Sequence, residues 1–529
     1  MSHKVLITDP LAPQGVARLQ AQSDIDFAVQ PGLTEQELAE QIALYQGLII
    51  RSGTRVTPDV IAAAQNLRVI GRAGIGVDNI DVEAATRRGI VVMNTPGGNN
   101  VTTAEHTISL LLALARNIPQ ATASLKAGHW QRSQFTGTEV CNKVLGLVGL
   151  GNIGTIVAER ALGLRMRIVA YDPFVTSEAA ARMNVELVPL TELYRQADFI
   201  SVHTPLTKET RGLIDTQAFA QMKDGVRVIN CARGGIVDET ALLAALESGT
   251  VTGAALDVFV DEPPPADHPL LQRQDVICTP HLGAATDEAQ INVAIAIADQ
   301  VAHFLQRGVI QNAVNFPALS QEQLTILEPY LFLGEKLGSF LAQITPHAPR
   351  EVHIEYSGEI TAYEVAPATA AVLRGLLSPI LEQAINVVNA PLVARERGIR
   401  VVESRSSTPS DFLNSIDVSV QARDSANSAA GAVFSNQTVR LVRVNDFHLE
   451  AVPEGTILLL NNKDVPGVVG QVGTLLGTLG INIAGLELGR EKIGGEAISL
   501  IHVDDQVSSE VLAALRRLDP ILSAQLIRL

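Results

Sequence analysis

An arginine, a glutamate and a histidine each follow an apolar stretch of the chain that is typical of a β-strand. Arg233 closes RVINCARGG, Glu262 comes soon after GAALDVF, and His281 lies in TPHLGAAT. If these stretches are parallel strands, the three side chains lie at the carboxyl edge of one sheet, where open α/β sheets bind ligands. A carboxylate stabilises a protonated imidazole, and a guanidinium matches the planar shape of a carboxylate. Each residue alone would more often be an ordinary surface residue, but together they predict proton exchange with a carboxylate-bearing substrate.

A glycine-rich turn precedes these residues, in VLGLVGLGNIGTIVAERAL. Gly149, Gly151 and Gly154 stand between an apolar strand and a helix, and a second strand ends on Asp172, 18 residues after Gly154 (172 − 154). Such glycines let the backbone approach a pyrophosphate at a helix N-terminus. The carboxylate would bind ribose hydroxyls and repel a 2′-phosphate, so the pattern favours NAD over NADP. A glycine turn in an unrelated α/β protein is the alternative, but the spacing favours a dinucleotide site and therefore hydride transfer.

Alternating strands and helices must position these groups. In the first hundred residues, KVLITD, FAVQ, GLIIRSG, LRVIGRAG and GIVVMNT alternate with helical stretches, which predicts a parallel sheet with crossover helices. Residues 102–126 are helical, with a break expected at Pro119. The glycine turn belongs to a unit that begins only near residue 143, so a complete α/β unit precedes it. Residues 287–308 predict one long helix that could carry the chain back to that first unit.

The remaining chain predicts two further units. Residues 318–454 mix strands and helices and contain a serine-rich segment, ESRSSTPSDF, that is typical of a loop. No chemistry is evident there. Residues 455–529 have the order βαββαβ of a ferredoxin-like sandwich.

Composition excludes several classes of protein. The 529 residues exceed what one hydrophobic core usually organises, and 47% hydrophobic with 18% charged residues is typical of globular domains. A net charge of −16 argues against nucleic acid or an anionic membrane as a partner, so an anionic substrate would need locally clustered arginines. The three cysteines are too scattered for a disulfide framework or a metal site. With neither a signal peptide nor a membrane span expected, the cytoplasm is the predicted location.

The combination of GLGNIG, NCARGGIVDE, ALDVFVDEP and TPHLGAAT resembles the D-isomer-specific 2-hydroxyacid dehydrogenases, and their phosphoglycerate dehydrogenase branch in particular. The likeness covers essentially the whole chain. It implies an α/β protein in which a Rossmann-type cofactor domain is inserted in a flavodoxin-like substrate domain, followed by an α+β intervening domain and a ferredoxin-like ACT domain. The implied boundaries are 1–100 with 287–317 for the substrate domain, 101–286 for the NAD-binding domain, 318–454 for the intervening domain and 455–529 for the ACT domain.

The resemblance also assigns roles to residues. Arg233, Glu262 and His281 become the catalytic trio. The implied NAD contacts are Ile75, Gly149, Gly151, Asn152, Ile153, Gly154, Asp172, Thr204, Cys231, Ala232, Arg233, Asp257, His281, Gly283 and Ala284. The implied substrate contacts are Arg51, Ser52, Gly53, Arg72 and Gly74, with Arg55 as a further candidate and Arg132 reaching a neighbouring subunit. Three positions depart from the family pattern: Asn152 where many relatives have arginine, Gly53 where alanine is commoner, and Ala285 where serine is common.

The C-terminal unit resembles an ACT domain, which binds amino acids. Asp464, Gly467 and Asn482 match its ligand loops, and the ligand implied by the family is L-serine. A purely structural dimerisation module is the alternative. In the intervening region, Arg440, Arg443 and His448 are the candidates for binding an anion.

The implied reaction is NAD-dependent oxidation of 3-phospho-D-glycerate to 3-phosphooxypyruvate, the first step of L-serine synthesis, in a homotetramer. One alternative is a relative that acts on glyoxylate, hydroxypyruvate or 2-oxoglutarate. Another is a NAD-sensing interaction protein on the same fold, like the C-terminal-binding corepressors.

Overall fold

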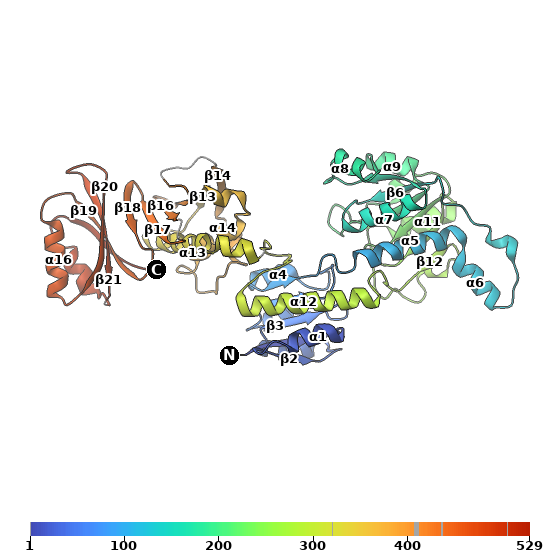
Figure 1. Ribbon diagram of the computed structural model, residues 1–529, viewed down its shortest axis with the longest axis horizontal. Coiled ribbons are helices and arrows are strands. Elements are labelled where there is room, and N and C mark those ends of the chain that lie inside the picture. Colours follow the sequence, from blue (N-terminus) through green and yellow to red (C-terminus); the bar gives the residue numbers. More distant parts are fainter. Residues whose placement is uncertain (1, 320, 407–411, 435–436, 505) are drawn as a thin grey trace.

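The computed structural model describes residues 2–319, 321–406, 412–434, 437–504 and 506–529. Part of the serine-rich segment expected to be a loop, residues 407–411, lies outside this range, and the expectation is wrong for residues 403–406, which belong to a β-strand. Figure 1 shows four units in an elongated arrangement, with the N-terminal unit between the central unit and the two that follow it in the chain. In the part of the chain that the structure describes, none of the helices has both the length and the apolar character needed to cross a bilayer.

The N-terminal unit is a parallel sheet with the strand order β2-β1-β3-β4-β5, which is the flavodoxin-like order. Its strands are β1 (His3–Ile7), β2 (Ile25–Val29), β3 (Gly47–Ile50), β4 (Val69–Arg72) and β5 (Val91–Met93). Its helices are α1 (Pro13–Gln20), α2 (Glu35–Gln41), η1 (Ile42–Leu44), α3 (Pro58–Ala63), α4 (Val82–Arg87) and α12 (Asp287–Arg307). Buried side chains on both faces of the sheet form two cores, as the near-continuous apolar strands require.

The central unit is inserted before α12, which returns to pack on β3, β4 and α1. Its parallel sheet has the order β12-β11-β10-β9-β6-β7-β8, so the strand order reverses between β6 and β9. The strands are β6 (Val144–Val148), β7 (Arg167–Tyr171), β8 (Glu186–Leu187), β9 (Phe199–Val202), β10 (Val226–Asn230), β11 (Val251–Leu256) and β12 (Val276–Cys278). The helices are α5 (Asn100–Arg116), α6 (Ile118–Lys126), η2 (Arg132–Phe135), α7 (Asn152–Gly163), α8 (Ser177–Arg182), α9 (Leu190–Gln196), α10 (Thr216–Phe219), α11 (Glu239–Ser248) and η3 (Pro269–Gln272). Dinucleotides bind at such a reversal, so the Rossmann-type insertion predicted from the sequence is confirmed.

The break expected at Pro119 falls two residues earlier. Asn117 has a φ of 53° and ends α5, and Pro119 then lies in the first turn of α6, where its missing N–H costs nothing. Helix α6 buries none of its side chains and projects from the central unit away from the rest of the chain (Figure 1).

The third unit is a six-stranded mixed sheet of order β14-β13-β15-β16-β17-β18. Its elements are β13 (Glu351–Ser357), β14 (Arg400–Ser406), β15 (Ser415–Gln421), β16 (Ala426–Val433), β17 (Val439–Val444), β18 (Phe447–Ala451), α13 (Gln321–Ile344), η4 (Glu359–Ala362), α14 (Ala366–Leu377) and α15 (Ala390–Glu396). It meets the N-terminal unit through α15 and α4, where Arg87 Nε donates to Glu396 Oε1 over 2.8 Å.

The C-terminal unit is an antiparallel sheet of order β20-β21-β19-β22, which confirms the ferredoxin-like prediction. Its elements are β19 (Thr456–Lys463), β20 (Ile483–Arg490), β21 (Glu496–Val503), β22 (Ile521–Arg528), α16 (Val468–Thr478) and α17 (Ser509–Leu515). One face of this sheet packs under its two helices. The other face, which includes Ile457, Leu459 and Leu500, is part of one hydrophobic core with the third unit.

Candidate functional site

His281 and Glu262 form a hydrogen-bonded pair at the carboxyl edge of the central sheet. His281 follows β12 and Glu262 follows β11, and His281 Nδ1 lies 2.7 Å from Glu262 Oε2. Burial raises the pKa of the Glu262 carboxyl, but the hydrogen bond and charge of His281, the Phe259 N–H and the charge of Arg233 lower it by more, so the carboxyl stays ionised at neutral pH. Since the carboxylate holds Nδ1, the Nε2 atom of His281 is the ring nitrogen left for proton exchange.

Arg233 joins the two units that flank this pair. It follows β10, and its Nε donates to Asp78 Oδ2 of the N-terminal unit over 2.8 Å. A Cβ on Gly76 would lie 1.8 Å from Arg233 Nη2, so this position accepts only glycine while the guanidinium lies against the loop. The charge of Arg233 also acts on Glu262, which holds His281, so the structure brings the predicted trio together. Asp78, which the sequence reasoning missed, is the partner of the arginine.

A second guanidinium, that of Arg72, lies near Arg233, and its positive charge has fewer hydrogen-bond partners. Among the described residues, its Nε atom is buried without a hydrogen-bond partner. Burial lowers the pKa of Arg72 to about 10, and the nearby positive charges of Arg233 and Arg51 contribute to this, while Asp78 and Asp9 oppose it. Arg72 is still cationic at neutral pH. Arg72 is half-buried, and a cation that is partly removed from water beside other cations is stabilised when an anion binds, so this cluster is suited to an anionic substrate.

The segment after β3 lies beside Arg72. The Arg51 N–H donates to Asp9 Oδ2 over 2.5 Å, and Arg51 Nη1 donates to the Pro10 carbonyl over 3.2 Å. Ser52, Gly53 and Arg55 are exposed. Asp9 holds this segment and was not predicted as a site residue. The signal available was an acidic residue directly after the first apolar strand.

The glycine turn has the geometry that a dinucleotide requires. Gly149 has a φ of 99°, which favours glycine, and Gly151 is the N-cap of the 12-residue helix α7 without any side-chain cap. The first N–H groups of α7 have no partner within the helix, and a Cβ on Gly151 would meet nothing within 4 Å, so a pyrophosphate has room to accept these N–H groups. Asp172 lies at the end of β7, where its two oxygens accept the Leu150 and Phe174 N–H groups over 2.8 Å each. A carboxylate keeps further lone pairs for ribose hydroxyls.

Other predicted cofactor residues lie along the same edge of the sheet. Within the described residues, Thr204 Oγ1 is buried without a partner, which suits an atom that meets a ligand. Burial raises the pKa of the Cys231 thiol to about 12, so the thiol stays neutral and lines the site without acting as a nucleophile. Asn152 and Ile153 form the first turn of α7, which contains no acidic residue. These residues fit NAD.

Asp257 organises the segment that contains His281. Its fully buried side chain accepts the Leu282 N–H over 2.7 Å, the Gly283 N–H over 2.8 Å and the Thr279 hydroxyl over 2.6 Å. It also lies 3.2 Å from His106 Nε2. Burial raises the pKa of Asp257, but these hydrogen bonds lower it by more. His106 was missed by the sequence reasoning. It lies one turn before Leu110 on α5, and this spacing places it on the same side of the helix as a buried residue, which indicates that it points into the protein.

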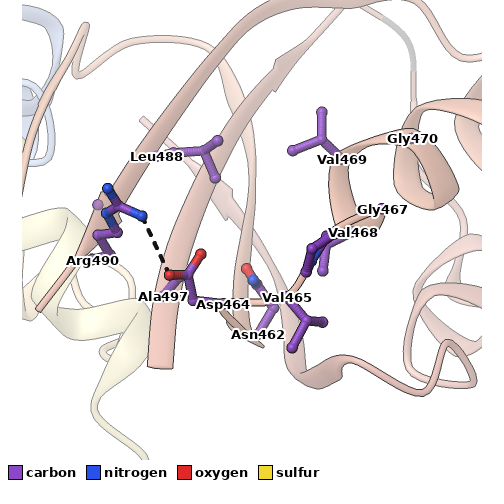
Figure 2. Close-up of a pocket in the computed structure, with 12 residues that line it drawn as sticks. Asn462, Asp464, Val465, Gly467, Val468, Val469, Gly470, Leu488, Arg490 and Ala497 are labelled. Carbon is purple, nitrogen blue, oxygen red and sulfur yellow. Dashed lines mark hydrogen bonds and ion pairs between the residues drawn. The ribbon is translucent and has the colours of Figure 1, made fainter. Parts of the chain in front are cut away.

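Two of the three predicted effector residues line one pocket in the C-terminal unit. This pocket, of about 460 Å³, includes Asp464 and Gly467 (Figure 2). Asp464 accepts the Gly494 N–H over 3.0 Å and meets Arg490 at 3.4 Å. Asn482 is not among the lining residues; its Nδ2 donates to Asp504 Oδ2 over 2.6 Å.

The remaining predicted residues lie outside these sites. Arg443 forms an ion pair with Asp417 and donates to the Asn445 carbonyl, so its charge is already compensated. Arg440 donates to its neighbouring carbonyl, and His448 is exposed on β18. Arg132 is exposed in η2, beyond α6.

Comparison with known proteins agrees with this geometry. Residues 108–283 match the family described as D-isomer specific 2-hydroxyacid dehydrogenase, NAD binding domain. Residues 326–445 match the D-3-phosphoglycerate dehydrogenase intervening domain, and residues 456–520 match the ACT domain. A solved D-lactate dehydrogenase from Aquifex aeolicus, complexed with NAD and lactic acid, is 28% identical with a TM-score of 0.53, over 59% of this chain and all of that one.

Two relatives match from end to end. The D-3-phosphoglycerate dehydrogenase of Methanocaldococcus jannaschii is 44% identical over 99% of this chain and 100% of its own length. That of Bacillus subtilis is 40% identical over 99% of both chains. The cofactor of this protein is accordingly NAD. The chain belongs to the D-3-phosphoglycerate dehydrogenases, within the D-isomer specific 2-hydroxyacid dehydrogenase family.

Proposed function

We propose that this protein oxidises 3-phospho-D-glycerate to 3-phosphooxypyruvate with NAD⁺, as the first step of L-serine synthesis. The observation that carries the proposal is the guanidinium cluster of Arg72, Arg233 and Arg51 beside the His281–Glu262 pair. The substrate has a carboxylate and a phosphate, and this cluster offers cations for both. It also overcomes the repulsion expected from a net charge of −16.

The arginine cluster and the His281–Glu262 pair have different roles in this proposal. Arg233 binds the carboxylate and orients the substrate, while Arg51 and Arg72 bind the phosphate. His281 Nε2 takes the proton from the C2 hydroxyl, and Glu262 stabilises the imidazolium that forms. Bound NAD⁺ supplies the acceptor for the hydride that leaves C2. The hydroxyl proton and the hydride together account for the two hydrogens removed.

Arg51→Ala tests whether the enzyme recognises its substrate through the phosphate group. We expect kcat/KM for 3-phosphoglycerate to fall at least thirtyfold, about 2 kcal/mol, while reduction of 2-oxoglutarate, which has no phosphate, changes little. NADH formation and consumption report the two reactions, and Arg88→Ala, which removes an exposed arginine at the end of α4, is the control. Equal losses with both substrates would favour a relative that acts on another 2-hydroxy acid.

We further propose that L-serine binds the C-terminal pocket and inhibits the enzyme. Asp464, just before the start of α16, offers a carboxylate for the α-ammonium group of serine, and Arg490 offers a cation for the carboxylate of serine (Figure 2). In a serine titration of the full-length enzyme, Asp464→Ala should resist inhibition and the exposed Asp519→Ala should not. Asn482→Ala tests the third predicted residue, since resistance there would mean that it contributes from outside this pocket. No inhibition of the wild type would contradict the proposal and leave a structural role for this unit.

Self-association is supported by the projecting segment around α6. Ile118, Leu125 and Trp130 are all more than half exposed, and Trp130 is 81% exposed, which is unusual for a large apolar side chain. We propose a homotetramer in the cytoplasm, with Arg132 reaching the site of a second copy. Light scattering should give four chains for the wild type and fewer for Trp130→Ser. A wild-type monomer would overturn this proposal.

A further inference from the structure

The loop that carries Glu262 is held by a second carboxylate and histidine, Glu239 and His268. Glu239 is the first residue of α11, and its Oε1 accepts the Val260 N–H over 2.8 Å. Its Oε2 lies 3.1 Å from His268 Nε2. The Glu239 side chain is 20% exposed and that of His268 is 17% exposed, so solvent competes little for these contacts. Glu239 therefore joins the start of α11 to both ends of the 260–268 segment.

The surroundings of His268 determine which ring nitrogen carries a proton. Its Nδ1 accepts the Leu270 N–H over 3.3 Å at the start of η3, so Nδ1 has no proton in this arrangement. The proton is then on Nε2, which donates to Glu239. The ring of Phe259 packs edge-on against the imidazole, with 5.8 Å between centroids. The neutral imidazole is thus held on three sides.

The loop is locked to the backbone beside Arg233 as well. A Cβ on Gly234 would lie 1.9 Å from the Phe259 carbonyl oxygen, so these two backbone segments are in direct contact. The Phe259 N–H in turn donates to Glu262 Oε1 over 3.1 Å. A shift of Phe259 and Val260 would consequently displace the Glu262 carboxylate that holds His281, and would disturb the backbone that positions Arg233.

We propose that Glu239 and His268 are positioning residues for hydride and proton transfer. Within the described part of the chain, neither forms a hydrogen bond or ion pair with His281 or with the arginine cluster; they act through the backbone of Phe259 and Val260 on Glu262. Misplacing a reacting group by about 1 Å can cost about a hundredfold in rate. Contacts that fix the position of the Glu262 carboxylate therefore raise the reaction rate as well as stabilising the fold. The proposal rests on the proposed oxidation of 3-phosphoglycerate.

His268→Asn isolates the contact with Glu239. An asparagine can still accept the Leu270 N–H as a helix cap but is too short to reach Glu239, whereas His268→Gln can reach it. With 3-phosphoglycerate, we expect His268→Asn to lower kcat about tenfold and to raise the primary deuterium isotope effect with 2-deuterated substrate. The Kd for NADH and the KM for substrate should stay within twofold of wild type. His268→Gln should recover most of the rate, and Glu247→Gln, an exposed change on the same helix, should have none of these effects.

A double-mutant cycle tests the route through Glu262. In a Glu262→Gln background, adding His268→Asn should lower kcat no further, because the carboxylate that it positions is gone. A full tenfold additional loss there would overturn the proposal, as would a loss that merely follows the unfolded fraction with an unchanged isotope effect. A wild type that turns over 3-phosphoglycerate alongside an equally active His268→Asn would reject the positioning role alone. A wild type inactive on 3-phosphoglycerate would reject the proposed function, and the positioning role with it.

Discussion

Replacing His281 with alanine is expected to lower kcat for 3-phosphoglycerate by a factor of about 100 or more, while NADH still binds. General base catalysis contributes about 10² to 10⁴ in rate, and the 2.7 Å contact with Glu262 makes His281 the group that can take the hydroxyl proton. His281 is one of many implied NAD contacts, and the glycine turn and Asp172 are on other strands, so the rest of the cofactor site should be intact. Stopped-flow measurement of NADH formation and fluorescence titration with NADH give the two quantities.

The backbone at His281 calls for a second variant. Its φ is 53°, a region that asparagine tolerates much better than alanine does. His281→Asn should be folded as stably as wild type and should show the same loss of turnover. If either variant, folded and saturated with NAD⁺, turned over at near the wild-type rate, the assignment of His281 as proton acceptor would be wrong.

Arg72→Met is expected to change activity and stability in opposite directions. Loss of a buried cation that pairs with a bound anion costs about 2 to 5 kcal/mol, so kcat/KM for 3-phosphoglycerate should fall about thirtyfold or more. The same cation is partly buried beside Arg233 and has an unpartnered Nε in the described structure, so its removal should raise the free energy of unfolding by about 1 kcal/mol. Steady-state kinetics and urea unfolding without ligand measure the two effects.

The matched control is Arg88→Met, an exposed arginine at the end of α4. It should change neither quantity by a measurable amount, because an exposed cation loses little when removed. An Arg72→Met variant that is both less active and less stable would mean that Arg72 stabilises the loop 72–78 and does not act mainly by binding the substrate anion.

The sequence was sufficient to predict the sheets and the residues that lie at the ends of their strands. Apolar runs predicted the parallel sheets, and residues directly after such runs, including Arg233 and His281, necessarily lie at the same edge. The Gly149 turn could be recognised because few residue types tolerate its φ of 99°. The runs also predicted the ferredoxin-like order of the last unit.

Pairings between distant segments could not be predicted in this way. Asp78 and Arg233 are separated by 155 positions, and their contact depends on how two units close on each other. Asn482 matched a ligand-loop pattern, but a pattern does not show that Asp504 holds its amide. One signal was overlooked: the four consecutive apolar residues 457–460 of β19 indicate a strand buried on both faces, and a partner for the second face.

That second face has a practical consequence for shortening the protein. Ile457, Leu459 and Leu500 share a core with the third unit, so deleting the C-terminal unit would uncover an apolar sheet and strand edges prone to aggregate. A truncation intended to leave a well-behaved dehydrogenase must therefore remove both units together, ending before α13 rather than before β19.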